Sequence, residues 1–139
     1  MRLRGIRKKA GLVAAMALVG VGAAVAPASA TGWNVDSWSD HCNYTDAYGC
    51  LYYSPNGAGG IFKGYGYYRD LSGYKFSDGH AVRNNAASIG SNTTNCGATT
   101  WVSAGSVGNY NWVHAGRGGN LNSALRNNEN SFDATANCT

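Results

Sequence analysis

The same polar unit occurs twice in this sequence, and the duplication constrains the fold more than any other feature. Residues 83–88 read RNNAAS and residues 126–131 read RNNENS, and a large apolar residue follows each unit. Each unit precedes a cysteine, Cys96 in the first case and Cys138 in the second. An order of features that occurs twice in this way predicts two structurally equivalent halves that pack face to face.

An aromatic residue precedes each polar unit, and small residues stand at the fifth and seventh positions after it. The two sets are Tyr53, Ala58 and Gly60 in the first half, and Trp101, Ser106 and Gly108 in the second. Turns in such segments need residues that tolerate a positive φ. Each half is therefore predicted to contain a hairpin, a connection, a polar turn and a strand.

Short segments rich in aromatic and β-branched residues alternate with Gly and Asn clusters, which is typical of strands joined by turns. The predicted strands are 50–54, 64–71, 87–91, 99–104, 110–115 and 131–136. One helix candidate of one or two turns lies at 120–128. The predicted fold class is all-β, a sandwich of two four-stranded Greek keys.

The first 30 residues have the pattern of a secretory signal peptide. Residues 1–9 are basic, residues 10–26 are apolar, and PASA at 27–30 offers a small-residue cleavage site after Ala30. A retained transmembrane helix is the alternative, because the apolar run is fairly long. We expect cleavage, which leaves one mature domain at 31–139, secreted into the extracellular space.

Removal of this leader changes the charge of the protein. The whole chain has a formal net charge of +4, but five of its eleven basic residues lie in the first nine positions. The rest of the chain carries six basic and seven acidic residues. No basic stripe is left to neutralise phosphates, so we expect no nucleic-acid partner. We also expect no membrane association after cleavage.

Four cysteines remain in the predicted mature chain. They are Cys42, Cys50, Cys96 and Cys138. An even number in an exported chain of this size predicts two disulfides. Four cysteines allow three pairings, and the spacing favours a local bond between the first two and a long bond between the last two. Zinc is the other use of four cysteines, but the sequence has no Cys-x-x-Cys pair and export disfavours it.

The aromatic hairpins followed by Asn-Asn-x-x-Ser turns resemble the two halves of the βγ-crystallin fold. The segment CNYTDAYGCLYYSPNGAGG at 42–60 resembles the start of the secreted bacterial metalloproteinase inhibitors of actinobacterial type, which are built on that fold. The resemblance covers roughly residues 42–136. Its motifs are degenerate: Ala58 and Ser106 replace the second aromatic residue, and Ile89 and Phe132 replace the final serine.

In the βγ-crystallin family, turns of this kind hold paired Ca²⁺ ions. The resemblance therefore implies metal candidates at Asn85 and Ser88 in the first unit, and at Asn128 and Ser131 in the second. These residues supply neutral oxygens only, and Glu129 is the one acid within either unit, whereas calcium affinity rises with the number of carboxylates. The alternative is structural, with Asn in left-handed turn geometry and Ser at the strand entry. We expect no required cofactor and at most weak Ca²⁺ binding.

The sequence offers little for catalysis, and we expect no enzyme. His41, His80 and His114 are scattered, and neither a His-Glu-x-x-His motif nor a Gly-x-Ser-x-Gly elbow occurs. Two of the aspartates could meet in space as a pair for glycoside hydrolysis, but acids spread over loops are more often surface residues. We expect His114 to point outward from a strand.

The Tyr and Trp residues suit a binding surface or a core. In the densest cluster, alternation along a strand puts Tyr65 and Tyr67 on one face and Tyr68 on the other. We expect most of these rings to fill the core. An exposed remainder fits a binding module better than a catalyst.

Two functional hypotheses follow. The first is a secreted, monomeric inhibitor of an extracellular peptidase, a metalloproteinase by resemblance, that acts through a rigid surface loop. Its reactive loop is unknown, because residues 103–111 lack the second cysteine pair that clamps this loop in the inhibitor family. The second is a non-inhibitory βγ-crystallin-type module with weak Ca²⁺ binding, glycan or cell-wall binding, or toxin activity.

Overall fold

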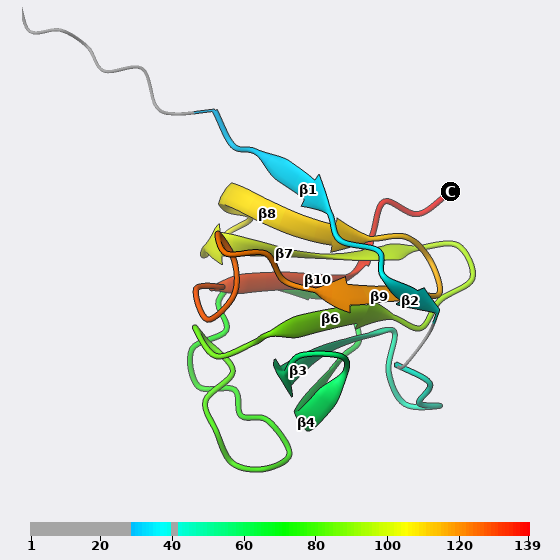
Figure 1. Cartoon of the computed structure of the whole chain (residues 1–139), viewed down its shortest axis with the longest axis horizontal. Helices are drawn as coiled ribbons and strands as arrows, with labels where there is room; N and C mark the ends of the chain where they lie inside the picture. The colour runs from blue at the N-terminus through cyan, green and yellow to red at the C-terminus, as the bar shows by residue number, and fades with distance from the viewer. Residues whose placement is uncertain (1–28, 40–41) are drawn as a thin grey trace, which may run out of the picture.

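The computed structural model describes residues 29–39 and 42–139 of the chain (Figure 1). The predicted signal peptide, apart from its last two residues, and His41 lie outside the described residues. In the described ranges, no helix is long and apolar enough to cross a membrane. The strands are β1 (Gly32–Asn34), β2 (Trp38–Ser39), β3 (Gly49–Ser54), β4 (Ala58–Gly64), β5 (Tyr67–Tyr68), β6 (Ser88–Ser91), β7 (Gly97–Ser103), β8 (Val107–Val113), β9 (Arg117–Asn120) and β10 (Ser131–Ala136).

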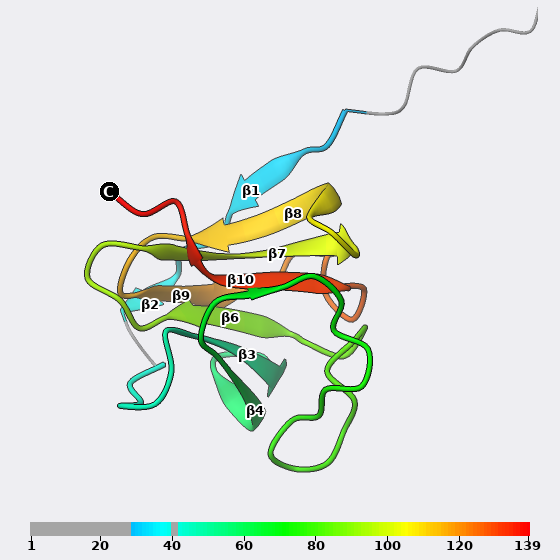
Figure 2. The same ribbon diagram turned by 180° about the vertical axis from the view of Figure 1, so that it is seen from behind.

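These strands form two five-stranded sheets, which confirms the predicted all-β class. Sheet A has the order β1-β8-β7-β10-β5, and sheet B has the order β2-β9-β6-β3-β4. Figure 2 shows β8, β7 and β10 side by side in sheet A. Strands β3 to β6 belong to the first half of the chain and β7 to β10 to the second. Each half therefore contributes three strands to one sheet and exchanges one strand, β5 or β9, with the other sheet.

The N-terminal segment 32–39, here called the strap, extends both sheets at their edges. Its first strand pairs parallel with β8 and its second pairs antiparallel with β9. Glycine makes this close approach feasible. A Cβ atom on Gly118 would lie 2.1 Å from Trp38 Nε1, and one on Gly119 would lie 1.6 Å from the carbonyl oxygen of Val35. A larger residue at Gly118 or Gly119 would displace the strap.

Equivalent hairpins begin the two halves, but their register differs by one residue from the sequence prediction. The β3–β4 ladder shifts after Tyr52 and the β7–β8 ladder shifts after Trp101. Gly59 and Gly108 take φ values of 76° and 83° at equivalent turn positions. The predicted alignment of Tyr53 with Trp101 is therefore wrong by one position. The correct counterparts in the first half are Tyr52, Gly57 and Gly59, in place of Tyr53, Ala58 and Gly60.

The main core lies between the two sheets. Leu51, Ile89, Val113 and Phe132 are fully buried there, each from a different strand. Tyr68, the inward residue of β5, packs against this core. Burial of each large apolar side chain contributes about 1.5–3 kcal/mol. The predicted alternation is confirmed for Tyr67 and Tyr68, whereas Tyr65 lies outside the strand.

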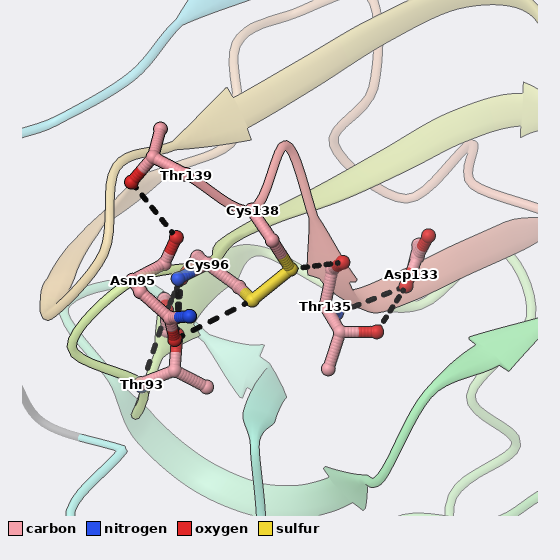
Figure 3. The surroundings of a disulfide bond; sticks show 8 residues. Thr93, Asn95, Cys96, Asp133, Thr135, Cys138 and Thr139 are labelled. Atoms are coloured by element: carbon pink, nitrogen blue, oxygen red, sulfur yellow. Dashed lines mark hydrogen bonds between the residues drawn. A yellow bond between two sulfur atoms is a disulfide. The ribbon is translucent and has the colours of Figure 1, made fainter.

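Two disulfides connect the four cysteines in the pairing that the spacing favours. They are Cys42–Cys50 and Cys96–Cys138. Figure 3 shows the second bond, which ties the segment before β7 to the segment after β10. Nearby, the backbone N–H of Thr139 donates to the carbonyl oxygen of Asn95 at 2.9 Å. The last residues are thereby fixed at one end of sheet A.

Most predicted strands are present, and one of them, 131–136, coincides with β10. Three details of the prediction are wrong. The segment 64–71 contains only the last residue of β4 and the two residues of β5. The predicted helix at 120–128 is absent, and turns follow the end of β9 at Asn120. The glycine-rich residues 117–120 form β9, which was not among the predicted strands. Strand β9 was not predicted because its glycines, which are typical of turns, allow the close approach of the strap that covers it.

Candidate functional site

The repeated serines fasten each hairpin turn to its own half. Ser88 Oγ donates to the last carbonyl oxygen of β3 at 2.7 Å and accepts from the backbone N–H of Gly57 at 3.0 Å. Ser131 Oγ donates to the last carbonyl oxygen of β7 at 2.7 Å and accepts from the backbone N–H of Ser106 at 3.1 Å. Both serines are fully buried. Their hydroxyls therefore act as equivalent clasps.

The repeated asparagines shape the two turns and join them to each other. Asn84 and Asn127 take φ values of 61° and 56°, in the left-handed region. The N–H of Asn84 donates to the carbonyl oxygen of Glu129, and the N–H of Asn127 donates to that of Ala86, both at 2.9 Å. The two polar units therefore lie against each other in a symmetrical pair. This pairing gives a structural reason for the duplication in the sequence.

The contact between the two polar units, here called the joint, is not fully symmetrical, because Glu129 in the second unit corresponds to Ala86 in the first. Its buried carboxylate accepts from the backbone N–H groups of Asn85 at 2.8 Å and Ala86 at 2.7 Å through Oε1, and from Asn128 at 3.1 Å through Oε2. Burial raises the pKa of Glu129 to about 7, although these backbone hydrogen bonds act to lower it. The joint is therefore a titratable, buried contact between the halves.

The metal candidates make hydrogen bonds within the protein through their Nδ2 and Oγ atoms. Asn85 and Asn128 donate from Nδ2 to the carbonyl oxygen four residues earlier, at 3.0 and 3.1 Å. Ser88 and Ser131 are used as clasps, and the N–H groups around Glu129 attract an anion. No group of three or more His, Cys, Asp or Glu side chains suited to a metal occurs in residues 29–39 and 42–139. The residues at the turns thus fit a structural role better than a calcium site.

The outer face of sheet B is covered by the chain itself. Residues in register across its strands are Gly118, Gly90, Cys50 and Lys63. Trp38 lies over Gly118, and the loop before β3 packs here with Cys42 and Ala47 buried. A Cβ atom on Gly90 would lie 3.1 Å from Cys42 Cβ. The Cys42–Cys50 bond holds this cover in place.

The outer face of sheet A carries a row of large and polar side chains. One residue from each strand contributes, in register: Asn34, Trp112, Thr99, Asp133 and Tyr67. Side chains of residues paired in register point to the same face of a sheet, and neighbouring strands are about 4.8 Å apart. The row therefore spans roughly 19 Å. Trp101 and Tyr110 form a second pair beside it, with ring centroids 6.1 Å apart.

An open groove of about 930 Å³ lies over this face, lined by Trp112, Thr99 and Asp133 of the row and by Trp101 and Tyr110. One side is aromatic and consists of the half-buried rings of Trp101, Tyr110 and Trp112. Thr99 lies in the middle, and Asp133 with Thr135 forms the other side. The C-terminal segment held by the Cys96–Cys138 bond closes one end, next to Asp133 and Thr135 (Figure 3). The groove is thus built on rigid strands and has one stapled end.

The polar groups of the groove have unused hydrogen-bonding capacity. Thr99 Oγ1 is buried and has no hydrogen-bond partner among the described residues. Asp133 Oδ1 accepts from Thr135 N at 2.9 Å and from Thr135 Oγ1 at 3.1 Å, whereas no donor in the described part of the chain reaches Oδ2. A buried polar group without a partner costs about 1–3 kcal/mol. Bound water or a polar ligand would relieve that cost.

His114 stands at the groove as an exposed side chain, as the alternation predicted. Its Nδ1 lies 2.6 Å from Asp36 Oδ2, and its backbone N–H donates to Asp36 Oδ1 at 3.0 Å. Partial burial acts to raise the pKa of Asp36, but the hydrogen bonds from His114 outweigh it, so the pKa is lowered. This pair fixes the strap against the end of β8.

Sequence reasoning found part of the outer face of sheet A. Tyr67 was expected on the face opposite Tyr68, and it is 50% exposed. The contributions of Trp112, Thr99 and Asp133 were missed, because they lie on three strands and become neighbours only through register. Alternation of large residues within 110–115 was the available signal.

Comparisons with family models, with curated proteins and with solved structures find no match for this chain. The geometry of the molecule itself therefore carries the functional argument.

Proposed function

We propose that the protein is an exported binding module with a βγ-crystallin-like double Greek-key fold, and that its ligand is a glycan. Three features support the fold proposal: the exchange of β5 and β9 between the sheets, the equivalent hairpins, and the serine clasps. The two disulfides are compatible with an extracellular location, which the leader sequence also favours.

The row of side chains across sheet A carries the glycan proposal. A sugar ring has an apolar face that packs on an aromatic ring and hydroxyls that bond to carboxylates and other hydroxyls. Trp101, Tyr110 and Trp112 supply the rings, while Asp133 and Thr135 supply the polar partners. An open groove also suits a chain of sugars. The groove suits an extended polypeptide less well, because extended peptides bind at sheet edges and this groove lies on a sheet face.

Binding of soluble β-linked oligosaccharides and of insoluble chitin and peptidoglycan tests this proposal. Trp112→Ala removes one ring of the groove, and we expect binding to weaken by about tenfold or more, as for a buried aromatic anchor. Trp33→Ala is the matched control, since Trp33 is exposed but alternates to the other face of β1. Trp33→Ala should leave the affinity unchanged. Absence of binding to every glycan by the unaltered protein would contradict the proposal.

Inhibition of an extracellular metalloproteinase is the second proposal, and a rigid exposed loop supports it. Residues 72–81 project between β5 and β6, and a bridge between Lys75 and Ala81 closes the loop. Phe76 is buried and its N–H donates to the carbonyl oxygen of His80 at 2.8 Å. The ring of Tyr53 stacks on His80 with centroids 4.1 Å apart. A loop held in this way loses little entropy when it binds an enzyme.

Residues 103–111, the region suggested by the inhibitor family, are less suitable for this role. They form the closed β7–β8 hairpin, in which the N–H of Gly105 donates to the carbonyl oxygen of Arg69 at 2.8 Å and the N–H of Ser106 to Ser131. Titration against a thermolysin-like metalloproteinase and a serine proteinase tests inhibition. If the loop at 72–81 acts, Asp78→Ala should weaken inhibition and Trp112→Ala should not. No inhibition of either enzyme at micromolar protein would contradict the second proposal.

A further inference from the structure

The charge of the groove narrows the class of glycan that it can bind, and this inference rests on the glycan proposal above. Asp133 supplies a carboxylate to the groove, and Asp36 lies beyond its end, held by His114. Among the described residues, no lysine or arginine lines the groove. Arg69 stands outside it at the hairpin end, with Nε 3.7 Å from the position of a Cβ atom on Gly105. The middle of the groove is therefore anionic and aromatic.

Asp133 is placed to receive a donor from a ligand. Register sets it between Thr99 on β7 and Tyr67 on β5. Thr135 holds Oδ1 through two hydrogen bonds, which orients the carboxylate and leaves Oδ2 without a donor from the described residues. A carboxylate only accepts, so the matching ligand group must donate. A positively charged donor makes the stronger bond, about twice as strong as a neutral one.

The fold does not require a carboxylate at this position. Ser131 and Ser88 are equivalent clasps, so Asp133, two residues further along β10, corresponds to Gly90 on β6. Sheet B forms with a glycine there. The hydrogen bonds to Thr135 use one oxygen of the carboxylate only. The second oxygen therefore points to a role in binding.

We propose that the groove selects glycans that carry free, protonated amino groups, such as oligomers of glucosamine. The ammonium group bonds to Asp133 Oδ2, and the sugar rings pack on Trp112 and Trp101. The faces of these indole rings attract the same positive charge. N-acetylated and neutral sugars offer the same ring faces without that charge.

Three hexasaccharides with the same β-1,4-linked backbone provide the test: those of glucosamine, N-acetylglucosamine and glucose. Binding to the exported protein with intact disulfides is measured by calorimetry at about pH 5.5, where the free amine is protonated. We expect the glucosamine oligomer to bind about tenfold more tightly than the glucose oligomer. Asp133→Asn should bring this ratio close to one.

Asp46→Asn is the matched control, because it removes the same charge from an exposed residue that pairs with Lys63 on sheet B. It should leave the ratio unchanged. Equal loss in both variants would show non-specific charge attraction and overturn the inference, and so would equal binding of all three sugars. In these outcomes the glycan proposal stands. If a lysine-rich peptide binds and none of the sugars does, both the amino-sugar inference and the glycan proposal are overturned.

Discussion

The outer faces of the two sheets differ, although the two halves of the chain are built alike. In sheet B the outer row is Gly118, Gly90 and Cys50, and the chain covers it with Trp38 and a disulfide-bonded loop. In sheet A the equivalent row is Tyr67, Asp133 and Thr99, and a groove lies over Asp133 and Thr99. Both sheets keep the hairpins, clasps and polar turns.

This difference distinguishes the features that the fold requires from those that can vary without changing it. The shared features set the strand order and the joint between the halves, and they recur in both. The outer row can be glycine or large polar and aromatic residues without a change of topology. A face lined with rings and a free carboxylate oxygen, left uncovered where its counterpart is sealed, is the place to expect a ligand.

Removal of the disulfides should give the largest effect, and the two bonds test the two faces separately. The Cys96–Cys138 bond closes a sequence separation of 42 residues, and the Cys42–Cys50 bond closes one of 8. Loop entropy predicts a loss of about 4 kcal/mol for C96A/C138A and about 2.5 kcal/mol for C42A/C50A, measured by urea unfolding. A larger loss for the local bond would mean that the cover of sheet B contributes packing beyond its loop closure.

The joint common to both halves should make stability depend on pH. The pKa of Glu129 rises from 4.5 in the unfolded chain to about 7 in the folded protein. The folded state then binds more protons between these values, so stability falls as the pH rises from about 4.5 to about 7. The loss should be on the order of 3 kcal/mol. Urea unfolding at a series of pH values measures it, and Glu129→Gln should flatten the profile. A profile that stays steep in this variant would contradict the assignment.

Substitution of the outer rows tests the contrast directly. Gly118→Ala puts a methyl group into the Trp38 ring and should cost about 2 kcal/mol of unfolding free energy. Its counterpart Tyr67 is half exposed, and Tyr67→Ala should cost no more than about 0.5 kcal/mol. Thermal unfolding of both variants measures the difference. Similar losses at the two positions would show that the face of sheet A is also needed for the fold.

Calcium should have the smallest effect. With weak binding at the polar turns, Ca²⁺ at a concentration equal to its Kd stabilises the protein by only about 0.4 kcal/mol. Urea unfolding with Ca²⁺, and with Mg²⁺ as the control, measures this. A stabilisation specific to Ca²⁺ of about 2 kcal/mol or more at millimolar concentration would establish a site. In that case Asn85 and Asn128 would be the first residues to substitute.

The features that could be predicted from the sequence are the local ones. The strand at 131–136 follows from its apolar alternation, and the disulfide pairing follows from spacing. The repeated Asn-Asn-x-x-Ser units correctly indicated two equivalent turns. The hairpin alignment failed by one residue because aromatic residues occupy both Tyr52 and Tyr53, and only the positive φ of Gly59 decides between them.

The features that could not be predicted depend on distant partners. Strand β9 could not be predicted, because its glycines are typical of turns in sequence but here make room for the strap. The strap comes some eighty residues earlier in the chain. The groove combines side chains from β7, β8 and β10, and a shift of one residue in either ladder between them would send that side chain to the core face. The role of Glu129 is hidden in the same way, since its partners in the first polar unit are backbone atoms.

The exchange of β5 and β9 gives the outer face of sheet A a further property. Tyr67 comes from the first half of the chain, while Trp112 and Asp133 come from the second. Neither half can present this face by itself, so binding of a ligand that spans it would require complete assembly of both. A saccharide long enough to contact Tyr67 and Trp112 together would link the exchanged strand β5 to the second half of the chain. At a concentration a hundredfold above its Kd, it would stabilise the assembled halves against separation by about 2.7 kcal/mol.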